Sequence, residues 1–593
     1  MGVDPSETAI MRRDPIALLN RSPLFHGLDR LTLTAIAAEL EWLSLPGGSI
    51  LFEAGEVPDS MYLVIAGRLA AFDAGTPARR IGMIAAGESV GEMGLVSGHG
   101  RTATVRALRD TVLLRLPRAS FDRVILRNPV AMLRVAQLVV RRMEAIGRRD
   151  TLTGSRTYTI VPQSIEVDVA GFATELVEAL RRIGRTELVW PIRCAEHTSG
   201  WFHGIESAND FVVYVADPSP TTWSQLCVRQ ADTLLMLTRA EAPAAPWSVR
   251  IRHPVTGAVN SPAELVLLHS GAVERGAASR WCAQLPGVPH HHVRGPADVA
   301  RIARLLSGKA VGLVLSGGGA RGFAHIGVVR ALREAGVPID LVGGTSIGAI
   351  MGAGVAAGWT HEEMVERFRR TFVKTNPLSD YTLPIVSLVS GRKVSRLLRE
   401  EFGDLAIEDL PLPFYAVSAN LTTGHGSVHR SGLLWRWLRA SVAIPGILPP
   451  VFNNGDVHVD GGAINNLPVD IMRLANPGIV IGVDVGSDRT FSADISDVDL
   501  PPLWRLLGWF RKNRQRPTIL QILIRAGMIN SAAATAAGRE LTDLLLHPPL
   551  ADIDLLHWRA FDRAIEVGYR HASEQLEKLD DAGRARLGLP PRS

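Results

Sequence analysis

A serine lies at the centre of a GxSxG pattern, Gly344-Thr345-Ser346-Ile347-Gly348. A short apolar run precedes the pattern, and an apolar helix-like run follows it. Small residues on both sides of a serine permit the sharp strand-to-helix turn that exposes a nucleophilic hydroxyl, and the helix N-terminus favours developing negative charge. We therefore predict that Ser346 is the nucleophile of an acyl-transfer reaction. The alternative is a serine that only forms a turn.

Upstream, the run VGLVLSGGGARG places Gly317, Gly318 and Gly319 directly after an apolar strand. Together with Gly322 these glycines fit the GxGxxG fingerprint of a dinucleotide-binding Rossmann unit. The same backbone N–H groups could instead stabilise the oxyanion of an acyl-transfer intermediate. The loop alone leaves both interpretations open.

The next strand decides between them. A dinucleotide site needs an acid at the end of the second strand to bind the ribose. Asp340 has nearly the right spacing, but it precedes its strand, whose end carries Gly344 and Ser346 instead. We therefore expect Gly317, Gly318 and Gly319 to form an oxyanion hole rather than a dinucleotide site.

A serine nucleophile also needs a base. Asp460 follows an alternating strand and precedes Gly461-Gly462, which places a carboxylate on a tight turn. His325 and His458 would complete a Ser-His-Asp triad. We expect His325 to pack or cap a helix, and His458, which alternates with Asp460 along its strand, is the second candidate base.

The order GGGxRG, GxSxG, DGG resembles that of the patatin-like phospholipases. The blocks ASVAIPGILPP at residues 440–450 and DGGAINNLP at 460–468 agree, and so does LLHWRAFDRAIEVGY near the C-terminus. The resemblance covers nearly all of residues 308–575 and implies an α/β three-layer domain. It also implies a Ser-Asp dyad without histidine, made by Ser346 and Asp460.

Arg321 follows the glycine loop directly. By the same resemblance, we expect it either to hold that loop or to meet a phospholipid headgroup. In the implied reaction, Asp460 takes the Ser346 proton, the serine attacks an ester carbonyl, and water later releases the acyl group.

A second group of residues lies near the N-terminus: Gly91 and Glu92, then Arg101, Thr102 and Ala103. A glutamate can accept from a ribose hydroxyl, and an arginine pairs with phosphate. The segment resembles the phosphate-binding cassette of cyclic nucleotide-binding domains, which implies an antiparallel β-roll with helices over residues 20–148. Glu92 would then bind the ribose of cAMP or cGMP and Arg101 its cyclic phosphate. The alternative is a domain that keeps the roll without the ligand.

Between these segments, residues 155–300 alternate helix and strand patterns, which predicts an α/β layout with parallel strands. We find no phosphate loop here. Asp217 follows a strand, and we expect it to form a turn or cap. We place the histidines at positions 290–292 in a surface loop and expect no metal site, because consecutive side chains point in different directions.

Composition limits the remaining classes of function. A net charge of +5 over 593 residues gives no indication of nucleic acid binding and does not oppose contact with an anionic membrane. Three widely spaced cysteines and an N-terminus without an apolar stretch predict a cytoplasmic protein without a signal peptide. Residues 341–359 are uncharged but glycine-rich, so we expect a buried strand, turn and helix there rather than a membrane span.

A nucleotide cassette ahead of a patatin-like segment is similar to the arrangement in the neuropathy target esterase family, and the chain is identified as a bacterial relative of that family. It departs from the animal members in having one cassette and no membrane anchor. Residues 501–527 mix tryptophans with arginines, which predicts either an interfacial helix for peripheral membrane association or a cap over the pocket.

The sequence therefore predicts a carboxylic ester hydrolase of phospholipase A or lysophospholipase type that needs no cofactor and has a regulatory cyclic nucleotide domain. Two alternatives stay open. One is a soluble esterase or thioesterase acting on short acyl groups. The other is a nucleotide-sensing scaffold with an inert hydrolase domain.

Overall fold

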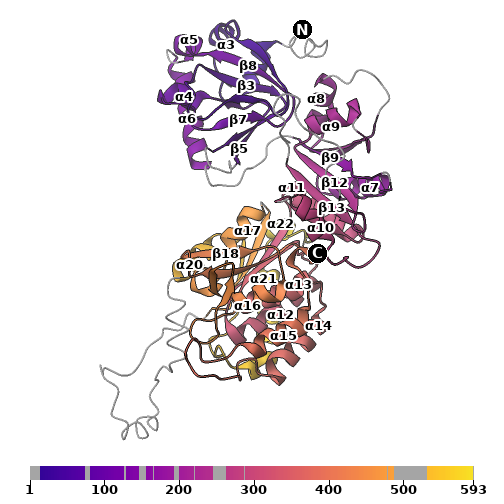
Figure 1. The fold of residues 1–593 in the computed structure, drawn as a ribbon. Helices are drawn as coiled ribbons and strands as arrows, with labels where there is room; N and C mark the ends of the chain where they lie inside the picture. The colour runs from indigo at the N-terminus through magenta and orange to yellow at the C-terminus, as the bar shows by residue number, and fades with distance from the viewer. Residues whose placement is uncertain are drawn as a thin grey trace, which may run out of the picture. The chain divides into compact units, whose positions relative to one another are not determined.

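The computed structural model describes most of the chain (Figure 1). The described residues are 14–73, 80–125, 128–145, 155–164, 166–191, 199–219, 221–244, 262–285, 287–476, 478–486 and 531–591. They form two compact units, Met1–Ala272 with Arg280–Ala303, and Val273–Ser279 with Arg304–Ser593. The ranges 20–148, 155–300 and 308–575 stay predictions.

The N-terminal part of the first unit contains two four-stranded antiparallel sheets, in the orders β1-β8-β3-β6 and β2-β7-β4-β5. The strands are β1 (Glu41–Leu45), β2 (Ile50–Phe52), β3 (Ser60–Ala66), β4 (Arg68–Phe72), β5 (Arg80–Ala85), β6 (Ser89–Val90), β7 (Thr104–Ala107) and β8 (Thr111–Pro117). The helices are α2 (Pro15–Arg21), α3 (Arg30–Ala37), α4 (Glu92–Ser97), α5 (Arg118–Ser120) and α6 (Pro129–Ala145), with a π-helical turn at Phe121–Ile125. The predicted antiparallel domain is confirmed.

Strand β3 contributes side chains to two apolar clusters of this part. Met61, Leu63 and Ile65 join an apolar cluster with the helices, whereas Tyr62 and Val64 join a second cluster with side chains from both sheets. Because successive side chains of a strand point to opposite faces, both faces of β3 are buried. Burial on both faces explains why the residues of β3 after Ser60 are all apolar or aromatic instead of alternating with polar ones.

The rest of the first unit is a six-stranded sheet in the order β10-β11-β9-β12-β13-β14, in which every pairing is parallel. The strands are β9 (Arg156–Pro162), β10 (Thr186–Val189), β11 (Phe211–Val215), β12 (Thr233–Arg239), β13 (Ala263–Leu268) and β14 (His290–Val293). The helices are α7 (Val169–Arg181), α8 (Ser199–Ala208), α9 (Thr222–Gln230), α10 (Ala277–Gln284) and α11 (Pro296–Ser307). The predicted parallel α/β layout is confirmed. Asp217 accepts a hydrogen bond from Thr221 in the turn before α9, as expected.

The prediction of a surface loop at residues 290–292 is wrong. These histidines lie in β14, and His291 and His292 are buried. His291 Nε2 lies 2.7 Å from Glu264 Oε2, and His292 Nδ1 lies 2.8 Å from His269 Nε2. Polar partners on β13 and after it therefore compensate for the burial of these rings. In the described part of the chain, no group of three or more His, Cys, Asp or Glu side chains is placed to hold a metal ion.

The second unit is built on one mixed sheet in the order β19-β20-β17-β16-β15-β21-β22, with β18 also paired to β17. The strands are β15 (Val311–Leu315), β16 (Leu341–Thr345), β17 (Phe414–Asn420), β18 (His425–His429), β19 (Val451–Asn453), β20 (Asp456–Asp460), β21 (Ile479–Val483) and β22 (Leu544–Leu546). In that order, the five strands from β17 to β22 are parallel, and β18, β19 and β20 pair antiparallel.

Helices cover this sheet on both faces (Figure 1). They are α12 (Ala324–Glu334), α13 (Ile347–Ala356), α14 (His361–Phe368), α15 (Arg392–Phe402), α16 (Leu434–Ser441), α17 (Val469–Ala475), α20 (Ser531–Glu540), α21 (Phe561–Lys578) and α22 (Asp581–Arg586). Leu313 and Leu315 of β15 face the larger apolar cluster, with α12 and α13, whereas Val314 faces a smaller one with α17. This is the predicted mixed α/β domain.

The expected strand, turn and helix at residues 341–359 are present as β16 and α13. In the described part of the chain, no helix combines the length and the apolar character that crossing a membrane requires. Residues 501–527, for which we predicted an interfacial helix or a cap, lie outside the described residues.

Candidate active site

Ser346 occupies the turn between β16 and α13, with φ 54° and ψ −128°. Few residues other than glycine adopt a positive φ, so the turn is strained in the way expected of a nucleophile held off the sheet. The two flanking glycines allow it. A Cβ on Gly348 would lie 2.3 Å from the Leu315 carbonyl oxygen, and a Cβ on Gly344 would lie 2.7 Å from the Gly348 backbone. The two glycines of the GxSxG pattern are therefore required by the packing around this turn.

Ser346 and Asp460 are in direct contact. The serine hydroxyl donates a hydrogen bond of 2.8 Å to Asp460 Oδ2. Asp460 ends β20, and its other oxygen accepts from the Gly462 N–H at 2.8 Å. Antiparallel pairing places Asp460 opposite Ser418 of β17, beside the end of β16. The two predicted residues, 114 positions apart in the chain, are thus brought together.

Burial dominates the electrostatics of Asp460. It raises the pKa of this carboxyl from 3.8 to about 6, against the opposing effect of the hydrogen bonds from Gly462 and Ser346. A buried carboxylate has lost hydration that would stabilise its charge, so it holds a proton more tightly. A carboxyl with this pKa is ionised at neutral pH and is a stronger base than an exposed aspartate.

The two histidines considered as bases lie elsewhere. His325 on α12 is fully buried, its Nε2 lies 2.9 Å from the Ser316 carbonyl oxygen, and burial lowers its pKa to about 4. It therefore packs beneath the glycine loop, as expected. His458 Nδ1 lies 3.0 Å from Ser418 Oγ. Within the described ranges, neither histidine hydrogen-bonds to Ser346.

The three glycines of the loop after β15 differ in their surroundings. Gly318 and Gly319 border the same pocket as Ser346, whereas the Gly317 N–H donates to the Asn466 carbonyl at 3.3 Å. The N–H groups of Gly318 and Gly319 donate to no acceptor that the structure describes. Gly319 has φ 56°, and a Cβ there would lie 2.2 Å from the Leu555 carbonyl oxygen, so this position requires glycine.

Arg321 anchors the loop. Its Nε donates to the Ile553 carbonyl at 2.7 Å, and the neighbouring Ala320 N–H donates to the Leu555 carbonyl at 2.7 Å. Of the two roles expected for Arg321, these contacts favour support of the loop. Asp340 lies directly before β16, where it pairs with Arg304 at 2.6 Å, so it is at the wrong end of the strand to bind a ribose.

The empty space above Ser346 amounts to about 970 Å³, part of which is open to solvent. Apart from Ser346, Asp460 and Thr371, its side chains are apolar. They come from α13, α15, the segment after α16 and the segment before α21: Ile347, Ile350, Val394, Leu397, Leu398, Val442, Ile444, Leu448, Leu555, Leu556 and Trp558, with Phe372, Pro377, Leu378, Pro445 and Ala463. An apolar lining of this kind suits an acyl chain.

Sequence reasoning missed two residues of this site. Ser441, at the end of α16, accepts from the Ser346 N–H at 2.9 Å and donates to the Val417 carbonyl at 2.6 Å. Asn466 donates to the Gly317 carbonyl at 3.2 Å. Both lie within the blocks ASVAIPGILPP and DGGAINNLP, which carried the resemblance but no assigned role.

The predicted nucleotide cassette is assembled in the first unit. Gly91, with φ 91°, precedes α4, and Glu92 is buried. Arg101 is also buried, and its guanidinium donates to the Gly91 carbonyl at 3.0 Å and the Ser60 carbonyl at 2.8 Å. Ala103 is buried beside it, whereas Thr102 is exposed.

Two further contacts hold Arg101. Asp59 lies 3.2 Å from its guanidinium, and the Phe52 ring lies 4.1 Å below it. Burial lowers the pKa of Arg101, and Asp59 opposes that effect. These partners therefore hold Arg101 in place at the cassette. A bound phosphate would be a further partner of the guanidinium or would replace one of them.

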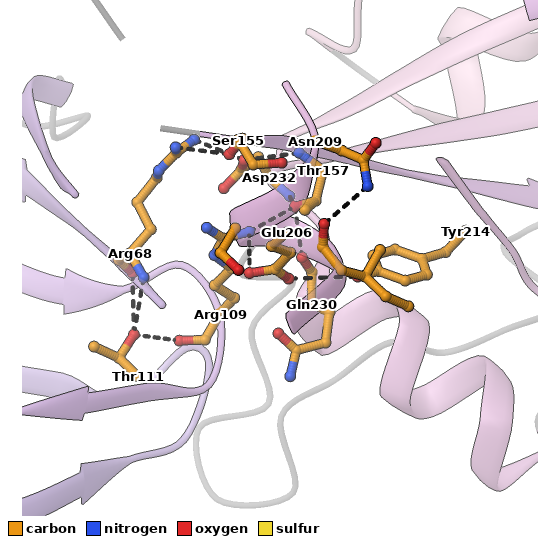
Figure 2. Close-up of polar contacts among 12 residues, drawn as sticks. Arg68, Arg109, Thr111, Ser155, Thr157, Glu206, Asn209, Tyr214, Gln230 and Asp232 are labelled. Carbon is orange, nitrogen blue, oxygen red and sulfur yellow. Dashed lines mark hydrogen bonds and ion pairs between the residues drawn. The ribbon is translucent and has the colours of Figure 1, made fainter. Parts of the chain in front are cut away.

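Buried ion pairs join the β-roll to the parallel sheet inside the first unit. Figure 2 shows Arg68 and Arg109 from the roll directed toward Asp232 and Glu206 from the sheet domain. Arg68 Nη1 lies 2.7 Å from Asp232 Oδ2, and Arg109 Nη1 lies 3.2 Å from Glu206 Oε2. Thr157 of β9 donates its N–H to Asp232 at 3.0 Å. All four charged side chains are buried, so each ion pair is shielded from water.

Three stretches of the chain match known protein families. Residues 42–128 match the cyclic nucleotide-binding domain, residues 155–310 the neuropathy target esterase family P-loop like domain, and residues 313–473 the patatin-like phospholipases. The match of the middle stretch to a P-loop like domain was not expected from the sequence, which predicted only an α/β layout there. The connection from β9 to α7 reads QSIEVD and lacks the glycine-rich pattern of a phosphate-binding P-loop, which explains why no such domain was predicted.

Similar proteins extend along nearly the whole chain. Lysophospholipase nte1 of Neosartorya fischeri and that of Aspergillus fumigatus are each 30% identical over 683 residues, which cover 98% of this chain. The chain spans 44% of the length of each. Among solved structures, the catabolite activator protein of Thermus thermophilus is 26% identical over 27% of this chain and 70% of that chain, with a TM-score of 0.20.

The bacterial source expected from the sequence stays a prediction. The order of the matched domains, by contrast, agrees with the order of the sites. The cassette around Arg101 lies in the first domain, and Ser346 and Asp460 lie in the third. In chain order, the protein therefore has a cyclic nucleotide-binding domain, a neuropathy target esterase family P-loop like domain and a patatin-like phospholipase domain.

Proposed function

We propose that this protein hydrolyses the acyl esters of phospholipids or lysophospholipids, with Ser346 as the nucleophile and Asp460 as the general base. The observation that carries the proposal is the 2.8 Å hydrogen bond from Ser346 Oγ to Asp460 Oδ2 at one end of an apolar pocket. The relatives named lysophospholipase support the substrate class.

In the proposed reaction, Asp460 removes the hydroxyl proton as Ser346 Oγ attacks the ester carbonyl carbon. The N–H groups of Gly318 and Gly319 face the developing oxyanion. The Gly317 N–H instead donates to the Asn466 carbonyl and so helps to hold the loop in position. The intermediate collapses, Asp460 returns the proton to the leaving alcohol, and the acyl group stays on the serine. Water, deprotonated by the same carboxylate, then releases the fatty acid.

The purified chain should release fatty acid from lysophosphatidylcholine faster than it cleaves a short-chain nitrophenyl ester, because the pocket beside Ser346 is lined almost wholly by apolar side chains that an acyl chain would contact. Ser346→Ala should abolish both activities. Equal rates on the two substrates would favour a short-chain esterase or thioesterase. Retention of either activity by Ser346→Ala would refute the nucleophile, and wild-type protein without activity would favour a scaffold.

The rate should depend on pH through Asp460. Because burial raises the pKa of this base to about 6, kcat/KM should fall as the pH falls through about 6 and level off above it. An ordinary exposed aspartate would lose activity only near about pH 4. The measurement is kcat/KM for a soluble ester across this range.

A His458→Gln variant provides the control for the pH profile. His458 bonds to Ser418 rather than to Ser346, so the acid limb should stay near pH 6 in this variant. Disappearance of the limb in His458→Gln, or a wild-type limb near about pH 4, would contradict the assignment of Asp460 as the base.

We also propose that the first domain binds a cyclic nucleotide, cAMP or cGMP, as a regulatory ligand. The observation that favours it is the position of the Arg101 guanidinium against the backbone of Gly91, beside buried Glu92. The arginine would pair with the cyclic phosphate and the glutamate would accept from the ribose. Regulation of hydrolysis further requires that the nucleotide bind one arrangement of the protein more tightly than another.

Titration calorimetry tests this ligand. The wild type should give a saturable signal with cAMP or cGMP that Arg101→Ala eliminates. Arg123→Ala, which removes an arginine paired with Glu39 outside the cassette, should bind like the wild type. Absence of a signal from the wild type would contradict nucleotide binding without bearing on hydrolysis.

A further inference from the structure

A second cavity in the patatin-like domain lies between α15 and α16 and belongs to neither proposed site. It has a volume of about 1160 Å³ and is open to solvent. Its charged side chains are five arginines and one glutamate: Arg392, Arg396, Arg399, Arg436, Arg439 and Glu400. We call it the arginine cavity. Such an excess of positive charge around one opening is an anion-binding environment.

Arg439 is the buried member of the group. Its side chain is only 4% exposed, and Nη2 donates to the Pro449 carbonyl at 2.9 Å. Nε and Nη1 are buried without a hydrogen-bond partner among the described residues. Burial lowers the pKa of Arg439 to about 10, with Asp380 opposing. A buried guanidinium with unused donors is costly unless an anion completes its hydrogen bonds.

The other arginines surround the opening. Residues 392, 396 and 399 share one face of α15, because they are spaced by one and two helical turns. Arg399 stacks 4.1 Å from the Trp435 ring, and Arg396 lies 3.6 Å from Glu400. The alternate face of α15, through Val394, Leu397 and Leu398, lines the catalytic pocket. One helix therefore borders both cavities.

An exposed apolar loop lies at the rim. Residues 380–390 fold back on themselves: the Ser390 N–H donates to the Asp380 carbonyl at 2.8 Å, and Tyr381 bridges to Val389. Ser390 borders the arginine cavity. Four apolar side chains between these ends are 63–82% exposed: Tyr381, Leu383, Ile385 and Val386. We call residues 380–390 the apolar loop.

We propose that the arginine cavity binds the phosphate of an anionic phospholipid in a bilayer surface, while the apolar loop enters the headgroup region beside it. Phosphate supplies the acceptors that Arg439 lacks, and guanidinium groups match its geometry. A free phosphate or a nucleic acid would satisfy the arginines but leave four apolar side chains in water, which is unusual for a soluble surface. A lipid surface accounts for both observations.

The lipid site includes neither Ser346 nor Asp460, so it does not rest on the proposed hydrolysis. It does place the catalytic pocket at the surface from which a phospholipid substrate would come, because α15 borders both. Vesicle binding should be measured with the full chain carrying Ser346→Ala, which prevents consumption of the lipid. Because vesicle binding is measured with a variant that does not consume lipid, the result for the lipid site does not depend on whether the proposed hydrolysis is correct.

The expected result is saturable sedimentation with vesicles of equal phosphatidylglycerol and phosphatidylcholine, and much weaker sedimentation with phosphatidylcholine alone. Each basic residue at an anionic surface contributes about fivefold in affinity, so Arg392→Glu with Arg396→Glu should weaken binding by at least about tenfold. These two exposed side chains are chosen because their replacement leaves the buried Arg439 in place. Added salt should reduce wild-type binding.

Arg570→Glu is the control for a charge reversal outside the arginine cavity, since Arg570 is exposed on α21, which packs against α12. It should leave binding to mixed vesicles nearly unchanged. Ile385→Ser should weaken binding, whereas Leu31→Ser, at an equally exposed apolar position in the first unit, should not. Together these variants separate the cavity and the loop from general effects of charge and hydrophobicity.

Three outcomes would overturn the proposal. One is equal binding to the two kinds of vesicle. Another is a loss in Arg570→Glu as large as that in the double variant. The third is saturable binding of inorganic phosphate, or of a single-stranded oligonucleotide, without binding to mixed vesicles, which would assign the cavity to a soluble anion instead.

Discussion

Replacing Asp460 by asparagine should eliminate ester hydrolysis and at the same time stabilise the folded protein at neutral pH. Asparagine keeps an acceptor for the Gly462 N–H but cannot remove the Ser346 proton. General-base catalysis contributes about 10²–10⁴ in rate, so kcat should fall by at least that range of factors. Hydrolysis of a soluble ester measures the loss.

The stabilisation follows from the raised pKa. Below about pH 4, Asp460 is protonated in both the folded and the unfolded chain, and its ionisation costs nothing. Between about pH 4 and pH 6, Asp460 is ionised in the unfolded chain but still protonated in the folded protein, so the wild type loses up to about 3 kcal/mol of its free energy of unfolding by the time the pH has passed about 6. The Asp460→Asn variant has no carboxyl to ionise at this position and escapes that loss. The melting temperature of the variant should exceed that of the wild type at about pH 7.5, and the difference should shrink toward about pH 4.

Asp456→Asn is the control, because Asp456 begins the same strand and has no contact with Ser346. It should keep the wild-type activity. Activity of Asp460→Asn within about tenfold of the wild type would rule out the dyad. A lower melting temperature of that variant at neutral pH would mean that the carboxylate is stabilised by its surroundings.

Asp232→Ala should destabilise the first unit by about 3–5 kcal/mol, because it leaves the Arg68 guanidinium buried without its carboxylate at 2.7 Å. The Thr157 N–H loses its acceptor as well. The loss should appear as faster amide hydrogen exchange in both β4 and β9 of the full chain, since the pair joins the two. Unchanged exchange in either strand would show that the pair does not hold them together.

Two controls separate the ion pair from the loss of any side chain. Replacing both partners, Arg68→Met with Asp232→Leu, removes the uncompensated charge and should recover most of the stability. Arg185→Ala breaks an ion pair with Asp210 on the surface, where both groups are solvated, and should have little effect.

The position of Ser346 on a strand-to-helix turn was predictable because the pattern that indicates it is local. Ser346 and its glycines lie within five residues, and the strand, turn and helix around them form a periodic pattern. Asp460 was predicted from its own turn, although its contact with Ser346 depends on antiparallel pairing of β20 with β17. The family resemblance, rather than spacing, linked the two in advance.

What could not be predicted depends on contacts between distant segments. Ser441 accepts from the Ser346 N–H across 95 positions, and a serine in the last turn of an amphipathic helix has no signature of its own. Arg68 and Asp232 are 164 positions apart, in a chain with many arginines. The loop predicted for residues 290–292 failed because strand pairing and the partners Glu264 and His269 outweigh the polarity of the rings.

The glycines around Ser346 bear on how related sequences should be interpreted. Gly344 and Gly348 are required by backbone contacts that exist whether or not the serine reacts. A homologue that had lost its catalytic power would therefore still be under selection to keep both of them, along with the helix that follows. The two glycines alone would then indicate only descent from an enzyme. An active homologue would be recognised by the presence of both the serine hydroxyl and its aspartate partner.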